Sequence, residues 1–437
     1  MDKTRDKVES FLRKYGMDPK VISIERTCKA FHKEMEKGLA GRRSSLAMLP
    51  TYIEIGRPIP RDEPVIVMDA GGTNFRAATV FFGSDGKPVI ENFKLSSMPG
   101  VKGEVGKKKF FSTMASYIEH VVDKSRNIGF CFSYPIEMSP NKDGRVLYFS
   151  KEIQAGEVAG EMIGENLNLA ISELGYRSNK QIILLNDTVA TLLAGRADAG
   201  GQTFDSYIGF ILGTGTNTSY VESNNNITKK KDLDPAKSQI VNVESGNFGK
   251  APRGQVDKEL DALSVKPGIN IFEKMISGAY LGPLCLKTLL AAAHEGLLST
   301  TTAANLEKIK QLTTKDVNEF MHHPSAGDHP LSSAVADVSQ DDAMTAYYLI
   351  DRLIERAAKL TAINLSSVAI KSGRGCNPCR PLCIVAEGTT FYQLKTLKQR
   401  VEYYLKQYLE EQKHIYYEII YVENATLIGA AIAGLTN

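Results

Sequence analysis

Apolar runs that are interrupted by glycine and small polar residues form the dominant pattern along this chain. The first run, residues 65–68, leads into Asp69 and the pair Gly71 and Gly72, and a second apolar run follows at residues 77–82. Two β-prone runs around a glycine pair predict a β-hairpin. A tip without Cβ atoms can expose backbone N–H groups to an anion. A plain hairpin turn explains the same residues, so this stretch alone leaves both interpretations open.

A second tip of similar kind lies far downstream. The apolar run at residues 207–212 leads into the Gly/Thr-rich residues 213–218, and β-prone residues 219–221 follow. Two such hairpins in two halves of one chain predict a duplicated α/β domain that grips a phosphate from both sides. Between them, residues 182–185 predict a strand that ends at Asn186 and Asp187 and opens a helix.

This series of motifs resembles the hexokinase family, in the superfamily of sugar kinases, actin and heat-shock ATPases. The resemblance implies an α/β fold of the two-lobed, actin-like ATPase type, with duplicated ribonuclease-H-like domains and a cleft between the lobes. It places the small lobe at residues 57–186, together with a C-terminal helix at about 423–437. Residues 1–56 and 187–422 form the expected large lobe.

The remaining pattern is largely helical. Apolar residues repeat at helical spacing within residues 1–40, and the region after Leu281 contains several further helices. Besides the strand at residues 182–185, the strands predicted in the first half of the chain are 65–69, 74–82, 88–94 and 128–132. The predicted later helices are 107–122, 284–298, 305–312, 314–321, 341–367 and 424–433.

Four further motifs extend the resemblance to the sugar site. Residues 272–282 reproduce the family pattern Phe-Glu-Lys-Met-Ile-Ser-Gly-x-Tyr-Leu-Gly, although Lys266 replaces the Asn of the preceding Asn-Pro-Gly. Tyr134 replaces Phe in the Ser-Phe-Pro sugar loop, and Ser150 replaces Thr in the Thr-Lys pair. By resemblance, the residues that bind hexose hydroxyls are Ser133, Ser150, Lys151, Asn186, Asp187, Asn217, Glu244 and Glu273.

Asp187 and Lys151 are the predicted catalytic residues. Phosphoryl transfer from ATP to an alcohol needs a base near the hydroxyl and groups that position the reactants. At a strand end and helix start, unpaired N–H groups favour an ionised Asp187, which can accept the proton of the hydroxyl. Lys151 can offset charge on the transferring phosphoryl group. The alternative is that Asn186 or Asp187 only caps the helix.

The same resemblance implies that the two Gly/Thr tips bind Mg-ATP. Residues 384–389 resemble the adenosine loop of the superfamily, with Glu387 where Asp is more usual. Asp69 is expected to hold Mg²⁺ through a water molecule. The expected ATP contacts are Asp69, Gly71, Gly72, Thr73, Asn74, Arg76, Gly213, Thr214, Gly388 and Thr389.

Composition narrows the classes of partner. The chain carries 53 basic and 50 acidic residues, a net charge of +3 that is too balanced for a nucleic-acid or membrane surface. No run approaches the roughly 18 apolar residues of a membrane span, and the charged amino terminus lacks a signal-peptide pattern. We therefore expect a cytoplasmic protein, monomeric or homodimeric.

The cysteine pattern predicts no structural metal. Cys376 and Cys379 have CxxC spacing, but no second such pair or paired histidines complete a zinc site. We expect a loop with two reduced thiols there, whereas Cys131 and Cys383 lie in apolar runs that indicate burial.

The implied activity is ATP-dependent phosphorylation of a hexose at its 6-hydroxyl, the first step of hexose metabolism. Glucose is the first candidate, with mannose and fructose as alternatives. A sugar sensor without turnover and an actin-like or chaperone ATPase are the competing classes. Asp187 and Lys151 argue against the sensor, and Asn217, Glu244 and Glu273 argue against the other ATPases. Sugar binding is expected to close the cleft and expel water.

Overall fold

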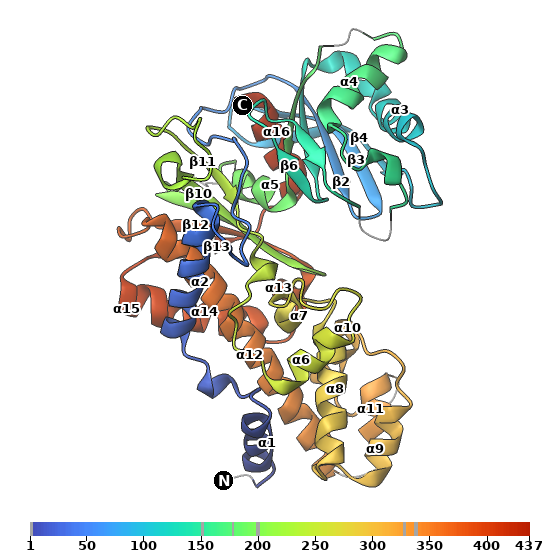
Figure 1. The fold of residues 1–437 in the computed structure, drawn as a ribbon, viewed down its shortest axis with the longest axis vertical. Helices are drawn as coiled ribbons and strands as arrows, with labels where there is room; N and C mark the ends of the chain where they lie inside the picture. The colour runs from blue at the N-terminus through green and yellow to red at the C-terminus, as the bar shows by residue number, and fades with distance from the viewer. Residues whose placement is uncertain (1–2, 150–152, 177–178, 198–201, 327–328, 336–339) are drawn as a thin grey trace.

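Two β-sheets form the centres of two lobes (Figure 1). The computed structural model describes residues 3–149, 153–176, 179–197, 202–326, 329–335 and 340–437. The five-stranded sheet has the order β4-β3-β2-β5-β8, and the six-stranded sheet has the order β1-β11-β10-β9-β12-β13. The two-lobed α/β fold expected from the sequence is thereby confirmed.

The five-stranded sheet contains the first predicted hairpin. Strands β2 and β3 pair antiparallel, with Gly71 opposite Asn74, and β5 and β8 extend the sheet as parallel strands. The bounds are β2 (Val65–Gly71), β3 (Asn74–Phe82), β4 (Pro88–Ser97), β5 (Asn127–Phe132) and β8 (Gln181–Leu185). Helices α3 (Lys107–Tyr117) and α4 (Ile163–Glu173) pack against each other in this lobe.

The six-stranded sheet contains the second hairpin. Strands β9 and β10 pair antiparallel with Leu212 opposite Thr216, and β12 lies parallel to β9 on its other side. The bounds are β1 (Leu49–Pro50), β9 (Ser206–Leu212), β10 (Thr216–Ser223), β11 (Ser238–Asn242), β12 (Leu382–Glu387) and β13 (Tyr417–Ile420). A separate small sheet consists of β6 (Ile136–Met138) and β7 (Gly144–Val146).

Helices α5 (Asp187–Ala194) and α16 (Ala425–Thr436) lie between the two sheets (Figure 1). Helix α5 packs on β9, β10 and β12, whereas α16 packs on β2, β5 and β8, and the two helices contact each other. Their backbones approach closely, because a Cβ at Gly429 would lie 1.9 Å from the carbonyl oxygen of Ala190. One apolar core therefore joins α5 and α16 to both sheets.

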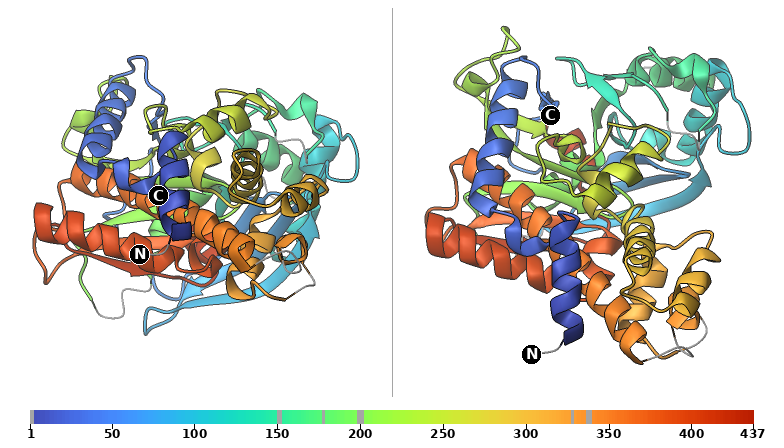
Figure 2. Two further views of the ribbon diagram at one scale, coloured as in Figure 1. Left: turned by 90° about the horizontal axis from the view of Figure 1, so that it is seen from below. Right: turned by 60° about the horizontal axis from the view of Figure 1, so that its bottom comes forward.

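The large lobe is built around the long helix α12 (Gln340–Ser372). Helices α1 (Lys3–Lys14), α2 (Ile24–Leu39) and α14 (Leu397–Leu405) pack along it, and Figure 2 shows the dark blue N-terminal helices beside the orange one. The remaining helices are α6 (Gln255–Ala262), α7 (Glu273–Ile276), α8 (Leu281–His294), α9 (Thr300–Glu307), α10 (Thr314–His322), α11 (Pro330–Val335), α13 (Thr389–Gln393) and α15 (Glu411–Lys413). None of the helices in the described residues combines the length and apolarity that a bilayer span requires.

One predicted helix was misplaced, and several observed elements were not predicted. The helix predicted at residues 305–312 is α9, which begins at Thr300 because the Ser299 hydroxyl accepts a hydrogen bond from the Thr302 N–H. Asp342 of α12 fixes this start by accepting from the Thr302 hydroxyl at 2.7 Å. Strand β11 was not predicted at all, and it is held by pairing with β10 and β1.

The close approach of α16 to α5 gives a test of the fold. Gly429→Ala places a methyl group against the Ala190 carbonyl, so we expect the free energy of unfolding to fall by about 3 kcal/mol through overpacking. Urea denaturation followed by circular dichroism measures this change. Gly156→Ala is the matched control, because a Cβ at Gly156 meets no atom within 4 Å. Equal midpoints for both variants would contradict the packing described here.

Candidate active site

A cavity of about 430 Å³ lies between the two lobes. Loops after β5 line it from the small lobe, and residues of β10, β11 and α7 line it from the large lobe. The start of α5 forms another part of its wall. It contains six of the eight residues predicted to bind a hexose, namely Ser133, Asn186, Asp187, Asn217, Glu244 and Glu273. The other two, Ser150 and Lys151, lie outside the described residues.

Asp187 is the first residue of α5 and lies at the cavity wall. Asn186 is the helix cap, since its side-chain oxygen accepts from the Thr188 N–H at 2.9 Å. The Thr188 N–H and hydroxyl also donate to Oδ1 of Asp187, at 2.7 and 3.2 Å. Asn186 therefore caps the helix, as one of the two interpretations expected. Asp187 lines the cavity.

The surroundings of Asp187 favour its neutral form more than water does. The pKa of Asp187 is raised to about 6, mainly by burial; the charges of Glu244 and Asp69 add to this shift, and the bonds from Thr188 oppose it. Since Asp69 belongs to the first hairpin and Glu244 to the large lobe, both lobes contribute to the electrostatics of this carboxylate.

Glu244 is held by two asparagine side chains. The Nδ2 group of Asn242 donates to Glu244 Oε1 at 2.8 Å, and Asn217 Nδ2 donates to the same oxygen at 3.4 Å. Asn217 also donates to Asn242 Oδ1 at 2.8 Å, so the three side chains form one network. Burial and the charge of Glu273 raise the pKa of Glu244. These bonds fix the carboxylate at the cavity wall.

Glu273 is joined to the second Gly/Thr tip. The Thr216 N–H donates to Glu273 Oε2 at 2.9 Å, and Asn270 Nδ2 donates to Oε1 at 3.2 Å. A Cβ at position 215 would lie 2.6 Å from Oε2, so Gly215 is required for this close approach. Burial raises the pKa of Glu273. The tip therefore positions a carboxylate of the cavity.

Sequence reasoning missed several polar residues of the cavity, among them Asn242 and Asn247. Asn242 ends the apolar part of β11, which is the same signal that identified Asn186. It also missed a contact across the cavity mouth. The Lys266 ammonium lies 4.8 Å from the centre of the Tyr148 ring, a cation–π distance that joins the large lobe to the small one.

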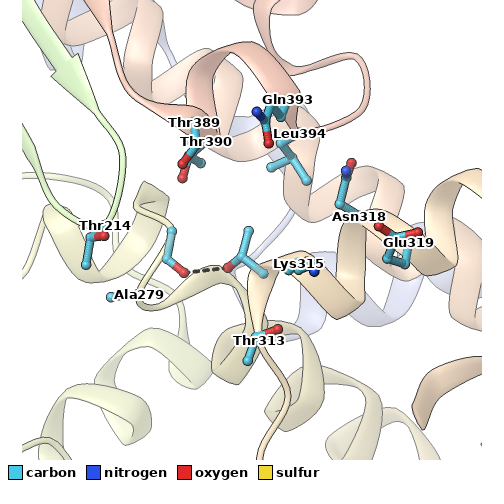
Figure 3. A pocket seen from close by; sticks show the side chains of 12 residues that line it. Thr214, Ala279, Thr313, Lys315, Asn318, Glu319, Thr389, Thr390, Gln393 and Leu394 are labelled. Atoms are coloured by element: carbon cyan, nitrogen blue, oxygen red, sulfur yellow. Dashed lines mark hydrogen bonds between the residues drawn. The ribbon is translucent and has the colours of Figure 1, made fainter. Parts of the chain in front are cut away.

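A second cavity, of about 360 Å³, lies beside the second tip (Figure 3). Thr214 lines one side, Thr389 and Thr390 of α13 another, and Lys315 and Asn318 of α10 a third. Gly213 and Gly388, both predicted to contact ATP, lie close to each other, since a Cβ at Gly213 would lie 3.6 Å from the Cα of Gly388.

Hydrogen bonds fix the walls of this second cavity. The Gly213 carbonyl accepts from the Thr390 hydroxyl at 2.9 Å and from the Gly278 N–H at 2.8 Å. The Gly278 carbonyl in turn accepts from the Thr314 hydroxyl at 2.7 Å, which is the dashed line in Figure 3. Hydrogen bonds thus join four segments that are far apart in the sequence around one cavity. Lys315, Asn318, Glu319 and Gln393 were not predicted to lie here.

The first hairpin supplies the remaining predicted ATP contacts, with Gly71, Gly72, Thr73 and Asn74 at its tip. The buried Asp69 forms an ion pair with Arg76, and the Thr426 hydroxyl donates to Asp69 Oδ2 at 2.9 Å. These residues line neither of the two cavities. Burial, with smaller contributions from Asp187 and Asp69, raises the pKa of Glu387 to about 7, while Arg76 lowers it.

The residues at the first hairpin fit a magnesium ion that arrives with its nucleotide. Asp69 Oδ1 is buried and has no N–H or O–H partner among the described residues. Within the same residues, no group of three or more His, Cys, Asp or Glu could hold a metal by itself. Mg²⁺ is usually bound by one or two carboxylates together with substrate phosphates and water.

Comparisons with known proteins point to one family. Residues 7–197 and residues 207–436 each match a family described as hexokinase. Hexokinase-5 of Oryza sativa subsp. japonica is 32% identical over 372 residues, which are 79% of this chain and 72% of that protein. Hexokinase-7 from the same organism is 28% identical over 439 residues, 94% of this chain and 92% of that protein.

A solved structure shows the same fold. A hexokinase from Schistosoma mansoni complexed with glucose has a TM-score of 0.78 at 22% sequence identity, and the match covers 99% of this chain and 100% of that chain. The family matches span nearly the whole sequence and include the cavity between the lobes. This chain therefore belongs to the hexokinase family, the enzymes that transfer a phosphoryl group from ATP to a hexose.

Proposed function

We propose that this hexokinase phosphorylates glucose at its 6-hydroxyl, with mannose and fructose as further acceptors, and that Asp187 is the general base. The observation that carries the proposal is the single cavity in which Asp187 lies together with Asn217, Glu244 and Glu273. It supports a hexose because the lining includes several carboxylates and amides, which can pair with a ring of hydroxyl groups.

Glu244 and Glu273 are the proposed recognition residues. Both carboxylates are largely buried, and each is already fixed by amide donors. A sugar hydroxyl that donates to such an oxygen compensates its burial, and a sugar that lacks the hydroxyl leaves the oxygen unpaired. Asn217 and Ser133 are proposed to bind further hydroxyls.

Asp187 is suited to accept a proton near neutral pH. Its raised pKa of about 6 brings it closer to the operating range of a base than an ordinary carboxyl group. Among the described residues, the bonds to its carboxylate reach Oδ1, so Oδ2 is the oxygen proposed to face the sugar. The proton of the 6-hydroxyl would move to this oxygen as the oxygen of the sugar attacks the terminal phosphorus.

The nucleotide is proposed to extend from the second cavity to the first hairpin. The 360 Å³ cavity with Thr214 and Thr389, next to Gly388, would hold the adenosine part, and the tip at residues 71–74 would bind the terminal phosphates. When bound, Mg²⁺ would neutralise negative charge on these phosphates, held by Asp69 through water. Lys151 is proposed to offset charge on the transferring group.

We further propose that the sugar draws together the small lobe, residues 57–186 with 423–437, and the large lobe, residues 1–56 and 187–422. The Tyr148–Lys266 contact supports this, since it already joins the two lobes at the cavity mouth. Closure would exclude water, which is itself a hydroxyl nucleophile, and so limit wasteful hydrolysis of ATP.

Turnover tests the proposal directly. We expect the protein to release ADP from Mg-ATP when glucose is present, and Asp187→Ala to lower kcat by about 10²- to 10⁴-fold while glucose binding persists. In the parent protein, kcat/KM for glucose should fall as the pH drops below about 6, where Asp187 becomes protonated. A coupled ADP assay over a panel of hexoses measures both. A parent protein that binds glucose without turnover would instead be a sugar sensor.

The raised pKa of Asp187 also predicts an effect on stability. A pKa above the ordinary value of 3.8 means that the ionised group is less stable in the folded chain than in the unfolded chain. The cost is absent below about pH 4, grows through about pH 6 and is constant above it. Asp187→Asn should therefore raise the urea midpoint at pH 7, and the gain should vanish at pH 4.

Asp232→Asn is the control for this measurement, because Asp232 is an exposed carboxylate. An Asp187→Asn protein that is less stable than the parent at pH 7 would show that the ionised carboxylate stabilises the fold.

Glu244 and Glu273 provide a separate test of the sugar site. Glu244→Gln and Glu273→Gln each remove a charged acceptor, so we expect glucose to bind about 10- to 100-fold more weakly. Calorimetry with glucose measures the dissociation constant, and the exposed Glu411, changed to Gln, is the control. If both variants bind glucose as tightly as the parent, the sugar binds elsewhere.

A further inference from the structure

Tyr134 lies in the sugar loop and contacts the first hairpin. It is 3% exposed, and its ring packs 5.1 Å from the ring of Phe132 and 5.1 Å from the ring of Phe149, measured between ring centres. The residue lines the 430 Å³ cavity. Its hydroxyl donates a hydrogen bond to the carbonyl oxygen of Gly72. One side chain thus connects the sugar cavity to the tip that is proposed to bind phosphate.

This bond restricts the direction of one amide donor. The peptide unit between Gly72 and Thr73 is planar and trans, so its C=O and N–H point in opposite directions. When Tyr134 holds the Gly72 carbonyl, the Thr73 N–H must point away from Tyr134. Gly72 has φ +56°, a conformation that glycine adopts readily, and without this bond the peptide plane could rotate more freely.

The rest of the tip is fixed by backbone bonds. The Ser133 N–H donates to the Ala70 carbonyl at 3.1 Å, and the Met98 N–H donates to the Thr73 carbonyl at 2.9 Å. The Thr73 N–H itself has no acceptor among the described residues. An oriented amide donor without a partner is suited to bind an anion, because no reorganisation is needed when the charge arrives.

We propose that the Tyr134 hydroxyl is a positioning group that couples hexose binding to nucleotide phosphate binding. The inference rests on the proposed function and adds a residue-level link between its two sites. A hexose that orders the loop of Ser133 and Tyr134 also orders the Gly72 carbonyl, and therefore the Thr73 N–H. The Phe of the family's Ser-Phe-Pro pattern cannot make this bond, so this contribution to the coupling depends on the tyrosine of this chain.

Tyr134→Phe tests the link, since it removes one oxygen atom and keeps the ring. Calorimetry with a non-hydrolysable ATP analogue and Mg²⁺ gives the dissociation constant with and without saturating glucose. In the parent, glucose should tighten analogue binding. In the variant, this gain should shrink about three- to tenfold, the amount expected for one neutral hydrogen bond. By linkage, the effect of the analogue on glucose affinity should shrink equally.

The control is Tyr417→Phe, which removes a hydroxyl bonded to the Glu402 carbonyl at 3.2 Å at the edge of the large-lobe sheet. It should leave the gain unchanged. Unchanged coupling in Tyr134→Phe would overturn the inference. Two other results would also overturn it. One is an equal loss of analogue affinity with and without glucose, and the other is a loss of coupling together with a lowered urea midpoint. Either result would mean that the hydroxyl has only a structural role.

The wild-type protein separates this inference from the function on which it rests. If the wild type releases ADP in a glucose-dependent way and Tyr134→Phe shows normal coupling, only the proposed role of Tyr134 is refuted. A wild type that neither binds nor phosphorylates a hexose removes the proposed function, and the inference with it.

Discussion

The cleft concentrates carboxylates that the surrounding chain keeps from full hydration. Burial raises the pKa of Asp187, Glu244, Glu273 and Glu387. Amide donors such as the Thr188 and Thr216 N–H groups hold some of these oxygens, at 2.7 and 2.9 Å. The carboxylates therefore impose a cost on the folded chain, and a ligand that supplies hydroxyl donors relieves part of it. This incomplete compensation supports the proposed role of these residues in sugar binding.

Two neighbouring helices carry or contact the acidic residues Asp187 and Asp69. Helix α5 begins with Asp187, and the first turn of α16 supplies the Thr426 hydroxyl that donates to Asp69. The absence of a side chain at Gly429 lets the two backbones meet. Because each helix packs on a different sheet, their mutual contact sets how Asp187 and the first hairpin face each other.

The sequence was sufficient where a periodic apolar run ended in a small or polar residue. Both hairpins and the strand before Asn186 gave this signal, and six predicted sugar contacts share one cavity. It was insufficient where a tertiary contact decides the outcome. The start of α9 depends on Asp342, forty residues away in the chain, and β11 depends on its neighbours in the sheet. The bond from Tyr134 to Gly72 also needed coordinates, since tyrosine and phenylalanine have the same apolar ring.

The late position of α16 in the chain has a consequence for folding during synthesis. Strands β2 and β5 are complete by Phe132, yet the inner face that Val65 and Val67 form is covered by residues 425–436. While the intervening three hundred residues leave the ribosome, this apolar face has no native cover. We expect the nascent small lobe to remain partly open, and therefore to need protection by a chaperone, until α16 inserts.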